Sequence, residues 1–357
     1  LLKNEGSVLP LKEGQKIAMI GPFISDARAM NGTWDGFSEA GRTVTIEQGM
    51  KARFPKGSLT FTRGCDAYNH ISGGVAAAVS AARAADVAVL TLGLPGNHSG
   101  ETSSMTSVEL PQAQKELLAA VKATGKPVVV LLVTGRPMAL ESVDELMDAL
   151  LVVWHPGTAG GDALADLLSG DYSPSGHLTM SFPRCDGQIP IRYNYKSTGR
   201  PLTKEMDYTQ SHKAKKNYQT CYLFTPNSPL YPFGYGLSYT QFSFTDLQVL
   251  DPEVAMGEDV RVKVRVTNVG EVPGTTVAQL YIRDKVASTT RPVRELKGFE
   301  RVSLEPGASA EVLFTITAAD MAFCREDMKF AQEPGEFGLW VGESCEAELE
   351  GKFIVKE

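Results

Sequence analysis

The sequence predicts an α/β domain followed by an all-β domain, and this fold class depends on three observations. In the first half, short apolar runs alternate with helical patterns, which is typical of a doubly wound α/β sandwich with a mostly parallel sheet. The run PVVVLLV at 127–133 is continuously apolar and indicates a central parallel strand that is covered on both faces. The run VRVKVRVT at 260–267 alternates strictly, as expected in an immunoglobulin-like or fibronectin type III β-sandwich.

In the first half, each apolar run is paired with a helical pattern. We expect strands at 15–22, 58–63, 86–92, 127–133 and 151–154, and helices at 45–53, 73–85, 110–123, 142–150 and 162–169. The segment 25–41 is rich in Gly, Asp and Asn and is expected to be a loop.

In the last third, short alternating runs are separated by Pro-Gly turns and give about seven strands, as a β-sandwich requires.

Between the two domains, periodicity fades and Tyr, Pro, Asn and Lys dominate. Because this stretch is long for a structureless loop, we expect its aromatic side chains to pin it to the folded parts. The expected domain bounds are 1–183 for the α/β domain, 184–240 for an extended linker and 241–357 for the β-sandwich. Within the β-sandwich, strands are expected at 260–267, 275–283, 302–304, 310–317 and 338–341.

Composition restricts the class of protein. The 357 residues are 43% hydrophobic and 22% charged, which indicates a globular chain of about two domains. A net charge of -7 argues against a nucleic-acid partner, and no apolar run approaches the roughly 18 residues of a membrane span. Five cysteines without a CxxC pair, and five histidines without ligand spacing, predict no metal and no cofactor. Cys185 and Cys221 could form a disulfide bridge, and the alternative is that both are free thiols.

The loop PGNHSGETSSM at 95–105 is the candidate site, because it follows the expected strand 86–92. Open α/β sheets place ligands at the carboxyl ends of their strands. Glu101 is the one acid in this loop, glycines beside it let the backbone approach a substrate, and nearby Ser and Thr hydroxyls could orient the carboxylate. The alternative is that Glu101 is an ordinary solvated acid.

A nucleotide site is a weaker alternative. The turns GPF at 21–23 and PGTAGG at 156–161 contain neither a GxGxxG pattern nor a phosphate-loop lysine. We therefore interpret them as tight turns into helices and disfavour a flavodoxin-like nucleotide binder.

Several stretches together resemble the glycoside hydrolase family three β-glucosidases. They occur in the order of that family and cover nearly the whole chain: LLKNEGSVLPL at 1–11, PGTAGGDALADLLSGDYSPSGHLTMSFPR at 156–184, IPIRYNYKSTGRP at 189–201, PLYPFGYGLSYTQF at 229–242 and RPVRELKGFERVSLEPG at 291–307.

The resemblance implies a retaining β-glycosidase that acts on terminal β-linked sugars in oligosaccharides or glycosides. In such enzymes an N-terminal barrel carries a nucleophilic Asp, and a loop of the α/β domain supplies a Glu. The matching segment HSGETSSM implies that Glu101 is the general acid/base, with Trp34, His98 and Ser99 in substrate binding and Trp34 near the leaving-group side.

The sequence departs from that family because it has no barrel. We therefore expect the C-terminal part of a longer enzyme, with the barrel of the same protein as its partner and no activity of the chain alone. The first residues, LLKNEGSVLPL, are no signal peptide, so a periplasmic or secreted location is implied only by the resemblance. The sequence leaves open whether the protein forms a homo-oligomer. The competing hypothesis is a non-catalytic carbohydrate-binding or adhesion module.

Overall fold

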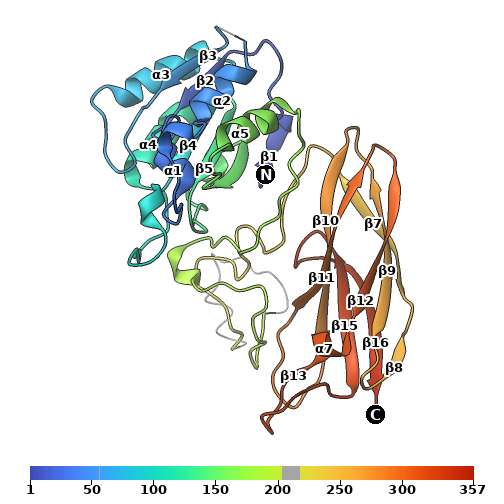
Figure 1. The fold of residues 1–357 in the computed structure, drawn as a ribbon. Helices are drawn as coiled ribbons and strands as arrows, with labels where there is room; N and C mark the ends of the chain where they lie inside the picture. The colour runs from blue at the N-terminus through green and yellow to red at the C-terminus, as the bar shows by residue number, and fades with distance from the viewer. Residues whose placement is uncertain (56, 203–217) are drawn as a thin grey trace. The chain divides into compact units, whose positions relative to one another are not determined.

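The computed structural model describes residues 1–55, 57–202 and 218–357 and divides into two compact units (Figure 1). Unit 1 comprises Leu1–Pro174 and Pro183–Ile189, and unit 2 comprises Ser175–Phe182 and Pro190–Glu357. The stretch expected as a linker thus begins in unit 1 and continues in unit 2 from Pro190 onward.

Unit 1 contains a six-stranded sheet with the order β1-β6-β5-β4-β2-β3. All neighbouring strands are parallel except β1, which pairs antiparallel with β6 at one edge. Every residue of β2, β4 and β5 is buried, so both faces of the sheet centre are covered. The strands are β1 (Lys3–Asn4), β2 (Ile17–Ile20), β3 (Leu59–Thr62), β4 (Val87–Gly93), β5 (Val128–Val133) and β6 (Ala149–Trp154).

Two pairs of helices cover this sheet. Helix α2 packs on α5, while α3 packs on α4 and on β2 and β3. A Cβ atom at Gly49 of α2 would lie 2.0 Å from the carbonyl oxygen of Gly161 in α5, so glycine permits this close crossing. The helices are α1 (Ala27–Asn31), α2 (Ile46–Arg53), α3 (Gly74–Ala84), α4 (Gln112–Lys122) and α5 (Gly160–Ser169), with 3-10 helices η1 (Glu5–Ser7), η2 (Ala40–Arg42), η3 (Gly96–His98), η4 (Asp144–Leu146) and η5 (Asp186–Gln188).

Two expectations for unit 1 were wrong. The helix expected at 142–150 is only the turn η4, because Asp148 and the residues after it are used by the sheet. The Asp148 carboxylate accepts from the backbone N–H of Val128 (2.8 Å) and from Lys122, and β6 then begins at Ala149. The expected loop 25–41 contains α1, whose first N–H groups are capped by the Asp26 carboxylate.

Unit 2 is a β-sandwich, as the alternating run predicted. One sheet has the order β11-β10-β15-β16-β8 and the other β12-β9-β7. Val260, Val262, Val264 and Val266 of β9 are all fully buried, which confirms the predicted apolar face. The elements are β7 (Phe242–Val249), β8 (Glu253–Ala255), β9 (Val260–Asn268), β10 (Gly274–Asp284), β11 (Glu295–Leu304), β12 (Ser309–Ile316), α7 (Ala318–Met321), β13 (Phe323–Cys324), β14 (Phe330–Ala331), β15 (Gly335–Gly342) and β16 (Leu349–Lys356).

Aromatic side chains pin the described parts of the irregular segment within unit 2, as expected. Tyr193 stacks on Phe233 with ring centroids 4.1 Å apart and meets Tyr281 of the sandwich edge-on at 5.9 Å. Residues 203–217 of the expected linker lie outside the described residues. All five cysteines are free thiols, so Cys185 and Cys221 are not bridged. No helix in the described ranges is long and apolar enough to span a bilayer.

Candidate active site

The strand order of unit 1 creates a point where the direction of winding reverses. After β2 the chain crosses to β3 on one side and then returns to add β4 on the other side of β2. In open α/β sheets, ligands bind outside the carboxyl ends of the strands at such a switch point. The loops that follow β2 and β4 flank it, and they carry Trp34 and Glu101, respectively. The topology therefore brings the two loops chosen from the sequence to the same sheet edge.

Glu101 lies on the exposed part of the loop after β4. The loop begins with Leu94, whose N–H donates to the carbonyl of Val133 (2.8 Å), and continues through η3. Glu101 is solvent-exposed, and the next residue, Thr102, has a φ of 62°. Within residues 1–55, 57–202 and 218–357, its carboxylate has no hydrogen-bond or ion-pair partner. It is therefore free to meet a group outside the described chain.

Trp34 lies directly against the loop that carries Glu101. A Cβ atom at Gly100 would be 2.7 Å from the indole Nε1, so only glycine lets the ring come this close. The neighbouring Thr33 hydroxyl donates to the carbonyls of Ser99 (2.7 Å) and Gly96. The Trp34 side chain nevertheless remains 74% exposed. A flat, exposed aromatic ring thus lies against the residue that precedes Glu101.

His98 is half-buried at the start of the bend. Its Nδ1 lies 2.9 Å from the Oδ1 of Asn97 and must donate, because an amide oxygen only accepts. Its ring packs on Tyr68 at a tilt of 41°, with centroids 5.2 Å apart. Burial raises the pKa of Tyr68, which keeps that phenol neutral. The role of His98 in substrate binding stays a prediction.

Ser99 directs its hydroxyl into the loop base. Its Oγ lies 3.3 Å from the carbonyl oxygen of Gly96 and 3.4 Å from Nε2 of His155. His155 Nδ1 lies 2.7 Å from the Ala29 carbonyl and therefore donates to it. These bonds do not reach the Glu101 carboxylate, so the expected orienting role of the Ser99 hydroxyl was wrong. Its contact with substrate stays a prediction.

Three residues near the loop were missed by sequence reasoning: Tyr68, Arg136 and His155. Arg136 has the clearest geometry, because it donates to the carbonyls of His98 (2.5 Å) and Ser103 (2.6 Å). The available signal was TGRP, which follows the apolar strand β5 directly, as the candidate loop follows β4. Charged residues at the ends of neighbouring parallel strands meet at one edge.

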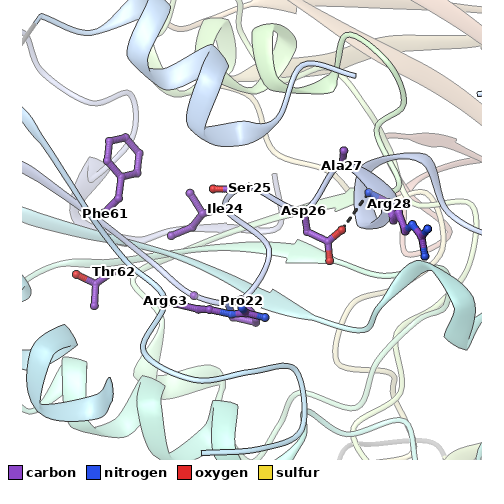
Figure 2. Close-up of a pocket in the computed structure, with 10 residues that line it drawn as sticks. Pro22, Ile24, Ser25, Asp26, Ala27, Arg28, Phe61, Thr62 and Arg63 are labelled. Atoms are coloured by element: carbon purple, nitrogen blue, oxygen red, sulfur yellow. Dashed lines mark hydrogen bonds between the residues drawn. The ribbon is translucent and has the colours of Figure 1, made fainter. Parts of the chain in front are cut away.

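A separate pocket of about 480 Å³ opens at the carboxyl ends of β2 and β3 (Figure 2). The Asp26 carboxylate is turned toward the backbone of α1 as a helix cap, and Arg63 pairs with Asp66 at 2.8 Å. Neither Glu101 nor Trp34 lines this pocket. The lining residues are Gly21, Pro22, Ile24, Ser25, Asp26, Ala27, Arg28, Phe61, Thr62 and Arg63.

No cluster of side chains that could bind a metal ion is found in the part of the chain that the structure describes. No group of three or more His, Cys, Asp or Glu side chains is gathered there as a metal site would require.

Comparison with known protein families identifies the family of this chain. The Glycosyl hydrolase family 3 C-terminal domain matches residues 1–239. The chain belongs to glycosyl hydrolase family 3. A Fibronectin type III-like domain matches residues 276–345, in agreement with the sandwich of unit 2. The resemblance inferred from the sequence, and the α/β-plus-sandwich fold class, are both confirmed.

Its relatives in this family are named as glycosidases. The chain is 39% identical to the periplasmic beta-glucosidase of Salmonella typhimurium, over 99% of the chain and 48% of that protein. It is 36% identical to a beta-xylosidase of Formosa agariphila, over 98% of the chain and 47% of that protein. The beta-glucosidase of Listeria innocua, solved in complex with glucose, superposes with a TM-score of 0.93 at 37% identity, over 100% of the chain and 48% of the solved chain. The chain thus spans about half the length of the relatives it matches.

Proposed function

We propose that this family 3 chain supplies the general acid/base, Glu101, of a retaining β-glycosidase that acts on terminal β-linked glucose or xylose. The observation that carries the proposal is an exposed carboxylate, without a partner in the described residues, on a loop that the exposed indole of Trp34 approaches at Gly100, at the switch point of the sheet. The relatives named beta-glucosidase and beta-xylosidase support the substrate class.

Retaining hydrolysis needs a second carboxyl group about 5–5.5 Å from the first. In the proposed mechanism a nucleophilic Asp on an N-terminal barrel attacks the anomeric carbon while Glu101 gives its proton to the departing oxygen. Glu101 then takes a proton from water as that water displaces the nucleophile.

The proposal also gives each segment of the chain a role. Residues 1–183 would carry the acid/base loop, 184–240 would link, and 241–357 would form the sandwich, while the barrel precedes them in the full-length protein. The chain alone would hydrolyse nothing appreciable, because the nucleophile is elsewhere. A periplasmic or secreted location is part of the proposal and is supported by the relative named a periplasmic beta-glucosidase.

The experiment replaces Glu101 with Ala in the full-length protein and adds azide, using an aryl β-glucoside with a good leaving group. The glycosyl-enzyme still forms, but water lacks its base, so turnover stalls. Azide needs no base: its nitrogen bonds to the anomeric carbon as the bond to the nucleophile breaks. We expect azide to restore turnover and to give the β-glucosyl azide.

A Glu109→Ala variant serves as the matched control, because Glu109 is a nearby acid that pairs with Lys115. It should hydrolyse normally and give no azide product. Release of only glucose from Glu101→Ala at an undiminished rate would exclude Glu101 as the acid/base. Unchanged weak sugar binding together with a dispensable Glu101 would favour the alternative, a non-catalytic carbohydrate-binding module.

A further inference from the structure

The loop that carries Glu101 is closed at its base by one guanidinium group. Nη2 of Arg136 donates to the carbonyl oxygen of His98 at 2.5 Å and to that of Ser103 at 2.6 Å. These two carbonyls stand on either side of Glu101, three residues before it and two after it. One nitrogen has two hydrogens, so both are used and the two limbs of the bend are joined.

Arg136 is itself held in place by its own strand connection. The Thr134 hydroxyl accepts from the Arg136 N–H (3.2 Å) and donates to the Arg136 carbonyl (2.9 Å). Thr134 is fully buried at the end of β5, so the turn is anchored in the core of unit 1. Glycine at 135 lets this turn approach the loop, since a Cβ atom there would lie 2.1 Å from the Oγ of Ser99.

The residue type suits the task. A guanidinium is planar and always charged, and its donors point in fixed directions, whereas a lysine ammonium is a compact point charge whose three donors rotate on a flexible stem. Hydrogen bonds from a charged donor are roughly twice as strong as neutral ones. Arg136 is half-buried, and its Nε is shielded from solvent without a partner in the described residues. Burying this unpaired N–H costs free energy, which the two hydrogen bonds to the loop must offset.

Glu101 has no such support of its own. Because its carboxylate has no partner among the described residues, its position depends on the backbone on either side. Thr33 ties the Ser99 carbonyl from the β2 side, and Arg136 ties His98 and Ser103 from the β5 side. The loop is thus fastened to both neighbouring strand connections while its tip stays open.

We propose that Arg136 is a positioning residue, which holds the bend at 98–103 so that the Glu101 carboxyl is presented at the leaving oxygen. This proposal rests on the proposed function of Glu101. A displacement of about 1 Å at a reacting group can lower the rate roughly 10²-fold, so a loosened bend should impair proton transfer specifically.

The experiment measures kcat/KM of the full-length protein for aryl β-glucosides with leaving groups of increasing pKa. Arg136→Met keeps an unbranched, flexible stem but removes the guanidinium and with it both hydrogen bonds to the loop. We expect a loss of roughly 10–100-fold for poor leaving groups and little loss for good ones, which need no proton. Arg136→Lys, which retains a charged donor group, should recover part of the loss and keeps the test open if Arg136→Met does not fold.

Arg83→Met is the matched control, because Arg83 is exposed in the last turn of α3. It should leave all rates unchanged. Hydrogen exchange of the amides at 96–105 is the second readout and should become faster in the Arg136 variants and in Thr33→Val, but not in Arg83→Met.

Two results would overturn the inference: an equal loss for every leaving group, or unchanged rates with unchanged exchange. Glu101→Gln in the same series separates this failure from that of the proposed function. If Glu101→Gln shows leaving-group dependence and the Arg136 variants do not, only the role of Arg136 is lost. If Glu101→Gln itself shows none, the acid role is lost and the positioning role with it.

Discussion

Glu101 of unit 1 and two acids of the sandwich differ in whether a basic side chain pairs with them. In the sandwich, acids on the strands are paired with basic residues across the sheet: Glu311 contacts Lys263 and Arg265, each at 3.3 Å, and Glu336 contacts Lys285 and Lys352. In unit 1, the acid at the carboxyl edge of the sheet, Glu101, has no partner among the described residues.

The difference indicates which acids remain available for chemistry. Exposed pairs stabilise a fold by only about 0–1 kcal/mol, but each pair occupies the oxygens of its carboxylate. An acid left unpaired on a bend, with its backbone fastened instead, costs little stability and keeps both oxygens open. The carboxylates of Glu311 and Glu336 are therefore occupied by basic partners, whereas the loop at 95–105 leaves that of Glu101 open to a ligand.

The largest expected effect tests this comparison directly in the full-length protein. Glu101→Gln should lower kcat/KM by the 10²–10⁴ that general acid–base catalysis usually supplies, and most for aryl glycosides with poor leaving groups. Glu311→Gln makes the same chemical change in the sandwich and should leave the rates unaltered. Steady-state kinetics on both variants decide the matter, and equal effects from the two substitutions would remove the distinction between the units.

A buried acid of the sandwich that has no basic partner in the described residues gives the second prediction. Asp284, at the end of β10, is 6% exposed; one oxygen accepts from the Val286 N–H (3.2 Å), and the other has no partner in the described residues. Burial raises the pKa of this carboxyl from 3.8 to about 6, against the lowering effect of Arg291. The folded state therefore holds this proton more tightly than the unfolded chain.

Stability from this group is complete below pH 3.8 and is lost as the pH rises through about 6. Asp284→Asn, which stays neutral and keeps the acceptor for Val286, should raise the free energy of unfolding at pH 7 by up to about 3 kcal/mol. At pH 3 it should change little. Urea-induced unfolding at the two pH values measures this, and a gain of equal size at both would show that charge is not the cause.

The smallest expected effect concerns the aromatic face beside Glu101. Trp34→Ala in the full-length protein should weaken binding of a disaccharide or aryl glycoside about 10-fold, since aromatic contacts of this kind contribute on the order of 1 kcal/mol beyond burial. Inhibition by a monosaccharide that fills only the cleavage subsite should stay the same. Inhibition constants for both ligands provide the measurement, and a parallel loss would place Trp34 away from the leaving-group side.

The loop at 95–105 was predictable in part. Its position after a buried strand, and a lone acid that directly follows a glycine, can be seen in the residues themselves. Its support could not be seen, because Arg136 lies more than thirty residues further along the chain and Thr33 lies more than sixty residues before it. Their bonds to the loop exist only because β2, β4 and β5 are neighbours in the sheet.

The sequence by itself predicted the class of each unit and the strands with the clearest patterns. An unbroken apolar run such as 127–133, or strict alternation such as 260–267, depends only on neighbouring residues and on which faces must be buried. The tertiary structure decided the rest. It made a strand of Ala149 and Leu150, because pairing with β5 outweighs a weak helical preference, and it set Trp34 against Gly100. Such contacts depend on strand order and close packing, which no local pattern contains.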